Sequence, residues 1–143
     1  MSAKIVIGVD GSDPSRRAVD WCAAQARAFD AEVVMVHALE VPTYVGAGPP
    51  YIWLTSATPE QREAWRDLAE RDWCKPLADA GVPFRVAVRD GDPASALMEA
   101  AEDEDAALVV VGRRGRGGFK KLLLGSTSHH LSHHLDRPLV IVP

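Results

Sequence analysis

The residues best suited to chemistry lie in one segment, Gly112–Ser128, which combines glycines with basic side chains. Five basic residues and no acid occur from Arg113 to Lys121. Glycine lets the main chain approach a ligand closely. The step Gly125-Ser126-Thr127 opens a predicted helix, whose first N–H groups and hydroxyls suit an anion. Arginine and lysine add charged donors. The segment therefore predicts a binding site for a phosphorylated ligand.

The spacing of the glycines excludes two common phosphate loops. The pattern G-x-x-x-x-G-K-[ST] fails because Gly118 stands where lysine is required. The pattern G-x-G-x-x-G, started at Gly115, fails because Lys120 occupies the third glycine position. The pattern that does match is G-x-x-G, nine residues, then G-[ST], and its fixed positions are Gly112, Gly115 and Gly125-Ser126.

Length and charge place the chain among ordinary globular domains. It has 143 residues, of which 47% are hydrophobic and 25% charged, and its net charge is −4. A chain of this length forms about one domain. An acidic balance argues against non-specific binding to nucleic acid or to an anionic membrane. Five acids without a base occur from Glu99 to Asp105, and we expect them at the opposite end of the fourth strand from the basic segment.

The elements that must position this segment alternate between strands and helices. Short runs of Val, Ile and Leu are typical of strands buried on both faces of a parallel sheet. These runs are Lys4–Val9, Glu32–Ala38, Ala106–Val111 and Leu139–Val142, with Phe84–Val88 as a weaker candidate nearer an edge. Helical stripes and capping residues predict helices that begin at Ser12 or Asp13, run from Thr58 to Leu77 with a kink or end at Pro76, and cover Pro93–Glu102 and Ser126–Leu135.

This order predicts an α/β domain, in which a five-stranded parallel sheet carries helices on both faces. Ligands of such sheets bind beyond the carboxyl ends of the strands, where the strand order reverses. The basic segment follows the fourth strand and therefore falls at such an end. One irregular stretch, Glu40–Ala57, is longer than an ordinary loop, and we expect a lid, an interface or partial disorder there.

Cysteine usage and hydropathy predict a cytoplasmic protein. The two cysteines, Cys22 and Cys74, lack the spacing of a disulfide framework or a zinc site, and we expect them to be buried and reduced. The apolar stretch after Lys4 is too short for a signal peptide. The longest apolar run, Ala106–Val111, is far below the roughly 18 residues that span a bilayer.

Several of these motifs together resemble the universal stress protein family, in its ATP-binding subclass. The resemblance rests on the G-x-x-G-x9-G-[ST] pattern and covers the chain except Glu40–Ala57. It implies one Rossmann-like domain over residues 1–143, of the adenine nucleotide alpha hydrolase-like type. Further stretches that match the family are Val9-Asp10-Gly11-Ser12, Met35-Val36-His37-Ala38, Gly91-Asp92-Pro93 and Pro138–Val142.

The resemblance implies ATP, or AMP or another adenine nucleotide, in the cleft between the first and fourth strands, with Mg²⁺ accompanying the phosphates. Asp10 would contact the ribose or the base, and the main chain of Val9 and Ala38 would contact adenine. The residues implied to line the ribose and the phosphates are Val111, Gly112, Arg114, Gly115, Gly125, Ser126, Thr127 and Ser128.

The resemblance also implies a stress-response regulator that forms homodimers by pairing its last strands, Leu139–Val142, and that acts on an unknown protein partner. We expect a nucleotide-dependent switch rather than an enzyme, because no set of base, nucleophile and orienting residue is recognisable. Two alternatives stay open. One is an ATP-binding enzyme with slow hydrolysis, and the other is an interaction module that does not depend on nucleotide.

Histidines and tryptophans offer further candidates. The last predicted helix carries two histidine pairs at i,i+4 spacing, which can bind zinc, but no third ligand is evident. A solvated or interface-facing helix is therefore favoured for His129, His130, His133 and His134. We expect His37 to be a core histidine and Trp21, Trp65 and Trp73 to fill the core or a groove. Tyr51 and Trp53, in the long irregular stretch, are candidates to cover adenine or a dimer partner.

Overall fold

The computed structural model describes residues 2–40, 57–114 and 124–143. Strands and helices alternate along these residues, as the sequence predicts. In chain order they are β1 (Lys4–Gly8), α1 (Asp13–Ala28), β2 (Glu32–Leu39), α2 (Pro59–Leu68), the π-helical turn η1 (Ala69–Trp73), α3 (Lys75–Asp79), β3 (Phe84–Asp90), α4 (Pro93–Asp103), β4 (Leu108–Gly112), α5 (Ser126–His134) and β5 (Leu139–Val142).

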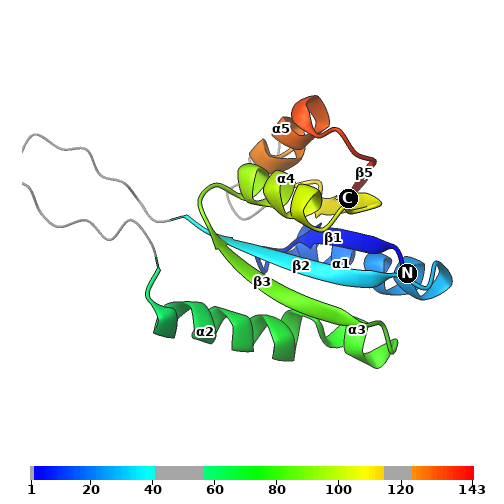
Figure 1. Cartoon of the computed structure of the whole chain (residues 1–143), viewed down its shortest axis with the longest axis horizontal. Helices are drawn as coiled ribbons and strands as arrows, with labels where there is room; N and C mark the ends of the chain where they lie inside the picture. Colours follow the sequence, from blue (N-terminus) through cyan, green and yellow to red (C-terminus); the bar gives the residue numbers. More distant parts are fainter. Residues whose placement is uncertain (1, 41–56, 115–123) are drawn as a thin grey trace, which may run out of the picture.

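The strands form one parallel sheet with the order β3-β2-β1-β4-β5 (Figure 1). From β1 the chain builds outward to β2 and β3, and it then crosses over to β4 and β5 on the other side of β1. The strand order therefore reverses between β1 and β4. Ligands of open parallel sheets bind at such a point. The predicted α/β class is confirmed, and so is the position of β3 at an edge.

Two hydrophobic cores cover the two faces of the sheet. Side chains alternate between the faces along each strand, so Ile5 and Ile7 pack in one core and Val6 packs in the other. The first core also receives side chains of α1, η1 and α3, and the second receives side chains of α4 and α5. Burial on both faces explains why the strand sequences show unbroken apolar runs.

Side-chain caps fix where three of the helices begin. Ser12 accepts a hydrogen bond from the Ser15 N–H (3.4 Å) at the start of α1, and Asp92 accepts one from the Ser95 N–H (3.0 Å) at the start of α4. Thr58 begins α2 with a capping box closed by Gln61. Such caps satisfy N–H groups that have no partner inside the helix. These helix starts agree with the sequence prediction.

The predicted single helix Thr58–Leu77 is wrong in its interior. The chain instead forms α2, the π-helical turn η1 and the short helix α3, with a wide-turn hydrogen bond from the Cys74 N–H to the Ala69 carbonyl (2.8 Å). Pro76 lies in the first turn of α3, where its missing N–H costs nothing. The helical path therefore continues to Asp79, so Pro76 does not end it, and the interruption lies at η1 and Cys74, just before the proline.

The start of the fourth strand also differs from the prediction. Asp105 adopts a left-handed backbone with φ of 49°, and the Ala106 N–H donates to the Ala101 carbonyl (2.9 Å). This turn closes α4, so β4 begins at Leu108 rather than at Ala106. Elsewhere the strand ends differ from the prediction by one or two residues, the range within which element boundaries are defined.

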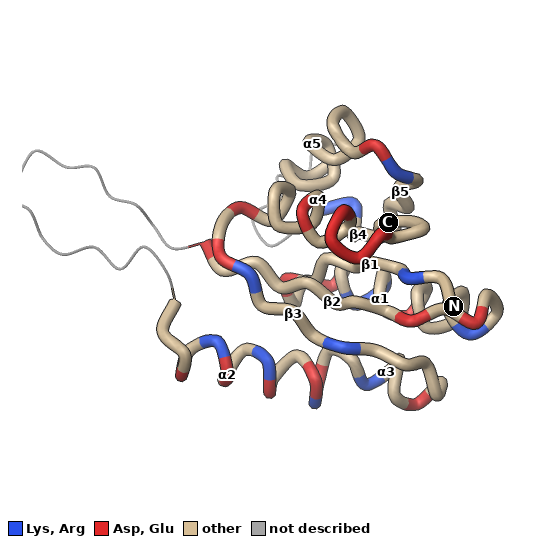
Figure 2. The backbone as a smooth tube through the Cα atoms, in the orientation of Figure 1, with Lys and Arg blue, Asp and Glu red and all other residues tan. Residues whose placement is uncertain are grey.

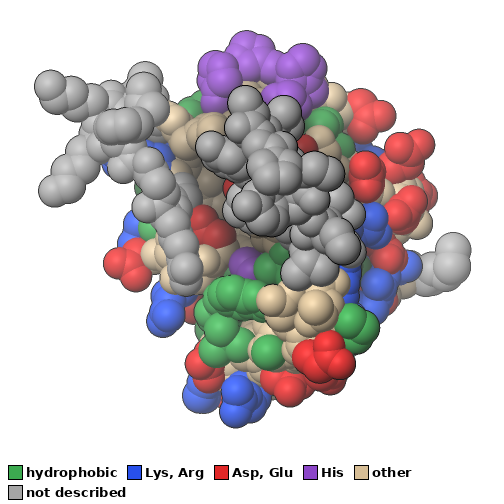
Figure 3. All heavy atoms as spheres, turned by 90° about the vertical axis from the view of Figure 1, so that its left-hand side faces the viewer, with side chains coloured by type: hydrophobic (Ala, Val, Ile, Leu, Met, Phe, Trp, Pro, Cys, Tyr) green, Lys and Arg blue, Asp and Glu red, His purple; other side chains and the backbone are tan. Residues whose placement is uncertain are grey.

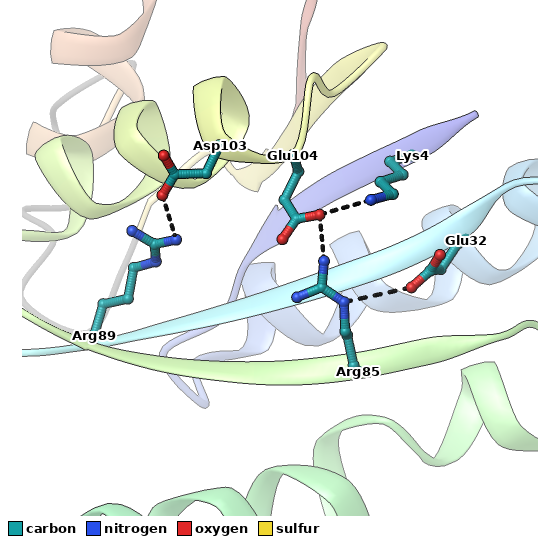
Figure 4. A network of polar contacts seen from close by, with 6 residues as sticks. All are labelled: Lys4, Glu32, Arg85, Arg89, Asp103 and Glu104. Atoms are coloured by element: carbon teal, nitrogen blue, oxygen red, sulfur yellow. Dashed lines mark hydrogen bonds and ion pairs between the residues drawn. The ribbon is translucent and has the colours of Figure 1, made fainter. Parts of the chain in front are cut away.

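The acidic run ends α4 at the amino ends of the strands (Figure 2), whereas Arg113 and Arg114, the described basic residues of the glycine-rich segment, follow the carboxyl end of β4, as predicted. Glu104 accepts a hydrogen bond from Lys4 Nζ (2.9 Å) and pairs with Arg85, which also contacts Glu32 (3.4 Å) (Figure 4). Asp103 accepts a hydrogen bond from Arg89 (2.9 Å). The side chain of Glu104 is only 14% exposed, so this end of the run packs against the strands through ion pairs.

The predictions made for the long irregular stretch fall largely outside the described residues. The long irregular stretch Glu40–Ala57 has only its first and last residues inside the described ranges, so its alternatives remain predictions. The suggested roles of Tyr51 and Trp53 stay untested for the same reason. Among the described helices, none is long and apolar enough to cross a membrane.

Candidate functional site

A cavity of about 730 Å³ opens beyond the carboxyl ends of β1, β2 and β4, at the reversal of strand order. The amino-terminal parts of α1, α4 and α5 and one side chain of α2 also line it. Of the eleven residues predicted to form the site, the cavity brings together Val9, Asp10, Ala38, Val111, Gly112, Arg114, Gly125, Ser126, Thr127 and Ser128. The eleventh, Gly115, lies outside the described residues.

The start of α5 supplies the part of the wall best suited to an anion. Gly125 is the N-cap residue, and no side chain caps this helix end. Ser126 and Thr127, in the first turn, line the cavity. Main-chain N–H groups at a helix start lack partners within the helix, and the helix dipole adds positive potential there. The wall formed by α5 can therefore receive a phosphate.

The hydroxyl of Ser128, predicted to bind phosphate, instead forms a hydrogen bond within the protein. Its Oγ donates to the carbonyl of Arg113 (2.7 Å), and the same carbonyl accepts the N–H of Gly125 (2.7 Å). The Ser128 residue is only 1% exposed. The side chain thus fixes the start of α5 to the end of β4, and its main-chain N–H is the group left to face an anion.

Gly112 makes a close contact with the first turn of α1. A Cβ atom at this position would lie 2.7 Å from the carbonyl carbon of Pro14 and 2.9 Å from the nitrogen of Ser15. Both are main-chain atoms, so neither can rotate away. Glycine here allows the first turn of α1 to pack against the end of β4, which places both elements at the cavity.

The described part of the basic segment divides between the cavity and the protein interior. Arg114 lines the cavity, whereas Arg113 is not among the lining residues. The Nε atom of Arg113 is buried and has no hydrogen-bond partner among the described residues. Asp10 and Glu40 also line the cavity, so its walls carry both signs of charge. Arg116, Lys120 and Lys121 lie outside the described residues.

The turn after β1 places Asp10 at the cavity. Its Oδ1 accepts the N–H of Ser12 (2.9 Å), and Gly11 between them has φ of 82°, a left-handed conformation that favours glycine. The Val9 N–H continues the sheet by donating to the Val36 carbonyl (3.1 Å). The sequence Val9-Asp10-Gly11-Ser12 therefore folds as a strand end followed by a tight turn, with a carboxylate at the cavity wall.

An aromatic cluster lies on the side of the cavity nearest β2. The Nδ1 atom of His37 is 2.8 Å from the carbonyl oxygen of Val9, which can only accept, so Nδ1 carries the proton. The ring centroid of His37 is 4.7 Å from that of Trp65 and 4.9 Å from that of Trp73. His37 is 7% exposed, which confirms it as a core histidine. It also lines the cavity.

Sequence reasoning missed several cavity residues. Glu40, Pro93 and Leu97 line the cavity without having been predicted, and Trp65 was assigned only to a core or a groove. Trp65 carries no local signal, because its place depends on how α2 packs across the sheet. Pro93 could have been found, since it follows a strand end and opens a helix, as the predicted residues do.

The exposed histidines of α5 form two pairs of contacting rings on the surface. The ring centroids of His129 and His133 are 4.7 Å apart, and those of His130 and His134 are 4.4 Å apart. Figure 3 shows histidine side chains gathered over α5 on the side where the strands end. Among the described residues, no group of three or more His, Cys, Asp or Glu side chains could hold a metal ion.

The cysteines lie in the first hydrophobic core, as predicted. Burial raises the pKa of Cys22 to about 12 and that of Cys74 to about 12. A thiol that stays protonated at neutral pH is a poor nucleophile and a poor metal ligand. Cys22 and Cys74 are therefore hydrophobic packing residues and take no part in the chemistry of the cavity.

Comparison with known proteins identifies a family. The profile of the universal stress protein family matches residues 1–143. A universal stress protein of Thermus aquaticus is 35% identical over 144 residues, which cover 99% of both chains. A universal stress protein solved in complex with cAMP is 27% identical, with a TM-score of 0.69 over 99% of this chain and 96% of that one. A dAMP complex from Archaeoglobus fulgidus has a TM-score of 0.70 at 19% identity, covering 99% of this chain and 98% of that one.

Proposed function

The chain belongs to the universal stress protein family, and on that premise we propose that its cavity binds ATP or a related adenine nucleotide. The proposed role is that of a stress-response regulator whose state depends on the bound nucleotide. The observation that carries the proposal is the cavity at the reversal of strand order, which the uncapped start of α5 and ten predicted residues line together. The relative solved with cAMP supports the choice of an adenine nucleotide.

The walls suggest how a nucleotide would lie. Phosphates would receive hydrogen bonds from the main chain at Ser126 and Thr127, with Arg114 as a charged donor on the same wall. The Asp10 carboxylate would accept a hydrogen bond from a ribose hydroxyl or from the base. The main chain at Ala38, where β2 ends, would contact the base. A nucleotide in this pose spans the end of β1, across the crevice between β2 and β4.

Magnesium would enter with the phosphates. Mg²⁺ is usually held by one or two carboxylates together with phosphate oxygens and water, rather than by a cage of protein ligands. Two carboxylates, Asp10 and Glu40, line the cavity, and the described residues contain no cluster of three or more potential ligands. These residues fit an ion that arrives on the nucleotide, where it would neutralise phosphate charge.

The proposed role is regulatory rather than enzymatic. A nucleotide that bridges α5 and β2 would stabilise one arrangement of the surrounding loops, and a protein partner would recognise that arrangement. Homodimers formed through β5 would present the site twice. The cytoplasmic location predicted from the sequence is part of the proposal, since the unlinked buried cysteines suit a reducing compartment.

Calorimetric titration of the purified chain with ATP, AMP and cAMP in the presence of Mg²⁺ tests the proposal. We expect saturable binding of at least one adenine nucleotide. Replacing Asp10 with alanine should weaken it about tenfold or more, because a hydrogen bond to a charged group contributes about 1.5–3 kcal/mol. Asp20→Ala is the matched control, since Asp20 is exposed on α1 and does not line the cavity.

Three outcomes would contradict this function. A folded chain that binds no adenine nucleotide would overturn nucleotide binding itself. Steady-state release of phosphate or pyrophosphate from ATP at an enzymatic rate, abolished by Asp10→Ala, would instead make the protein an ATP-using enzyme. Preserved cellular function in a variant that has lost nucleotide binding would favour the nucleotide-independent interaction module.

A further inference from the structure

The aromatic cluster of His37, Trp65 and Trp73 connects the hydrophobic core to the cavity. Trp73 is 6% exposed and packs in the core, and its ring centroid lies 6.0 Å from that of Trp65. The His37 ring contacts both indoles and is held by its hydrogen bond to the Val9 carbonyl. Trp65 is only half-buried and lines the cavity. The cluster therefore extends from the core, at Trp73, to the cavity wall, at His37 and Trp65.

The position of Trp65 relative to the start of α5 suggests which part of a ligand it meets. The N-terminus of α5 is attached to the end of β4 through the Arg113 carbonyl. The Trp65 ring packs against the His37 ring of β2 at a tilt of 42°. The helix that carries Trp65 is fixed to β3 by Arg62, which donates to the Val88 carbonyl (3.1 Å). Since β1 separates β2 from β4, the anion-binding wall and Trp65 lie on opposite sides of the β1 end.

We propose that Trp65 is the surface on which the base of the bound nucleotide packs, so that α2 determines the preference for ligands that carry a base. This inference rests on the nucleotide-binding function proposed above. A nucleotide whose phosphates contact α5 would direct its base across the end of β1 toward β2 and Trp65. An indole face offers a purine a large contact area, and stacking of this kind depends little on which base is present.

Calorimetric titrations with AMP and with ribose 5-phosphate, which lacks the base, test the inference. Base–aromatic stacking predicts that Trp65→Ala weakens AMP binding roughly ten- to hundredfold and leaves binding of ribose 5-phosphate unchanged. Trp65→Phe keeps an aromatic face and should retain most of the affinity for AMP. Trp21→Ala is the matched control, because Trp21 is also half-buried but lies on α1 and does not line the cavity.

Tryptophan fluorescence tests the inference even if Trp65→Ala does not fold. Stacking of AMP on Trp65 should quench tryptophan emission of the wild-type chain. Trp65→Phe should lose most of that quenching while it still binds AMP. Quenching that persists unchanged in Trp65→Phe would overturn the inference.

The remaining outcomes separate the two proposals. A Trp65→Ala variant that binds AMP as tightly as wild type, or that loses both ligands equally, would overturn the role of Trp65 and leave nucleotide binding intact. A wild-type chain that binds no adenine nucleotide would overturn both. Tight AMP binding with a selective loss in Trp65→Ala would support both.

Discussion

At the scale of single residues, one glycine, Gly112, can both allow a ligand to approach and allow two elements to pack closely. The sequence predicts Gly112 as part of a phosphate-binding pattern, because glycine permits close approach of a ligand. In the structure its missing side chain makes room for the main chain of Pro14 and Ser15. The two uses are compatible, since the contact brings α1 and β4 together at the cavity. A pattern of residue types locates such a site, but it does not reveal which neighbour requires the glycine.

The contact at Gly112 yields a stability prediction. Gly112→Ala should lower the free energy of unfolding by about 1–3 kcal/mol, the usual cost of overpacking, because main-chain atoms cannot yield to the new Cβ. Gly8→Ala is the matched control. A Cβ there would meet only the flexible end of Leu97, at 2.7 Å from its Cδ1, and the loss should be smaller. Urea denaturation of both variants provides the measurement, and equal losses would contradict the assigned cause.

At the scale of elements, the sequence predicts well where local chemistry decides and less well where packing decides. Ser12 and Asp92 cap their helices as predicted, because capping depends on residues only a few positions apart. The π-helical turn at Ala69–Trp73 could not be predicted. It places Trp73 in the core with Trp65 facing the cavity, and that arrangement depends on the sheet beneath α2.

The ion pairs between α4 and the strands make stability depend on pH. Hydrogen bonds from Arg85 and Lys4 lower the pKa of Glu104 below its ordinary value of 4.5. A lowered pKa in the folded state means that the carboxylate stabilises the fold above about pH 4.5, and that this contribution disappears as pH falls through the folded pKa. Glu104→Gln should therefore cost about 1 kcal/mol at neutral pH and much less near pH 3.

Thermal or chemical unfolding between pH 3 and pH 7 measures this difference. Glu102→Gln serves as the control, because Glu102 is exposed on the same helix and forms none of the ion pairs found among the described residues. Its effect should stay near zero across the range. A Glu104→Gln deficit that does not change with pH would show that shape, rather than charge, explains the contribution of Glu104.

At the scale of the whole molecule, the two edges of the sheet differ in how they are protected. Charged side chains stand on β3, and Arg62 of α2 donates to its Val88 carbonyl. Charge at an edge discourages pairing with another sheet. By contrast, β5 has the sequence Leu-Val-Ile-Val, and all four residues are half-buried. The apolar edge is thus the one through which the family resemblance implies dimers, and association through it stays a prediction.

A charged residue on β5 should prevent dimer formation through that edge. We expect Ile141→Lys to shift the chain from dimer to monomer in sedimentation velocity experiments, because an unpaired charge would be buried between two apolar strands. Ala87→Lys, a like change on the opposite edge strand, should leave the dimer intact. A wild-type monomer, or a dimer that withstands Ile141→Lys, would contradict association through β5.

The main-chain N–H and carbonyl of Arg113 connect α5 to β5. Its N–H donates to the carbonyl of Val142 (2.7 Å), while its own carbonyl accepts from Gly125 and Ser128. If nucleotide binding shifts the start of α5, the shift would therefore be transmitted to the edge strand β5 through Arg113 alone. Thermodynamic linkage makes such coupling reciprocal. If bound nucleotide increases the affinity of the chain for a second copy by some factor, self-association increases its affinity for nucleotide by the same factor. The abundance of the protein would then act as a signal, since raising its concentration alone would fill more of its sites.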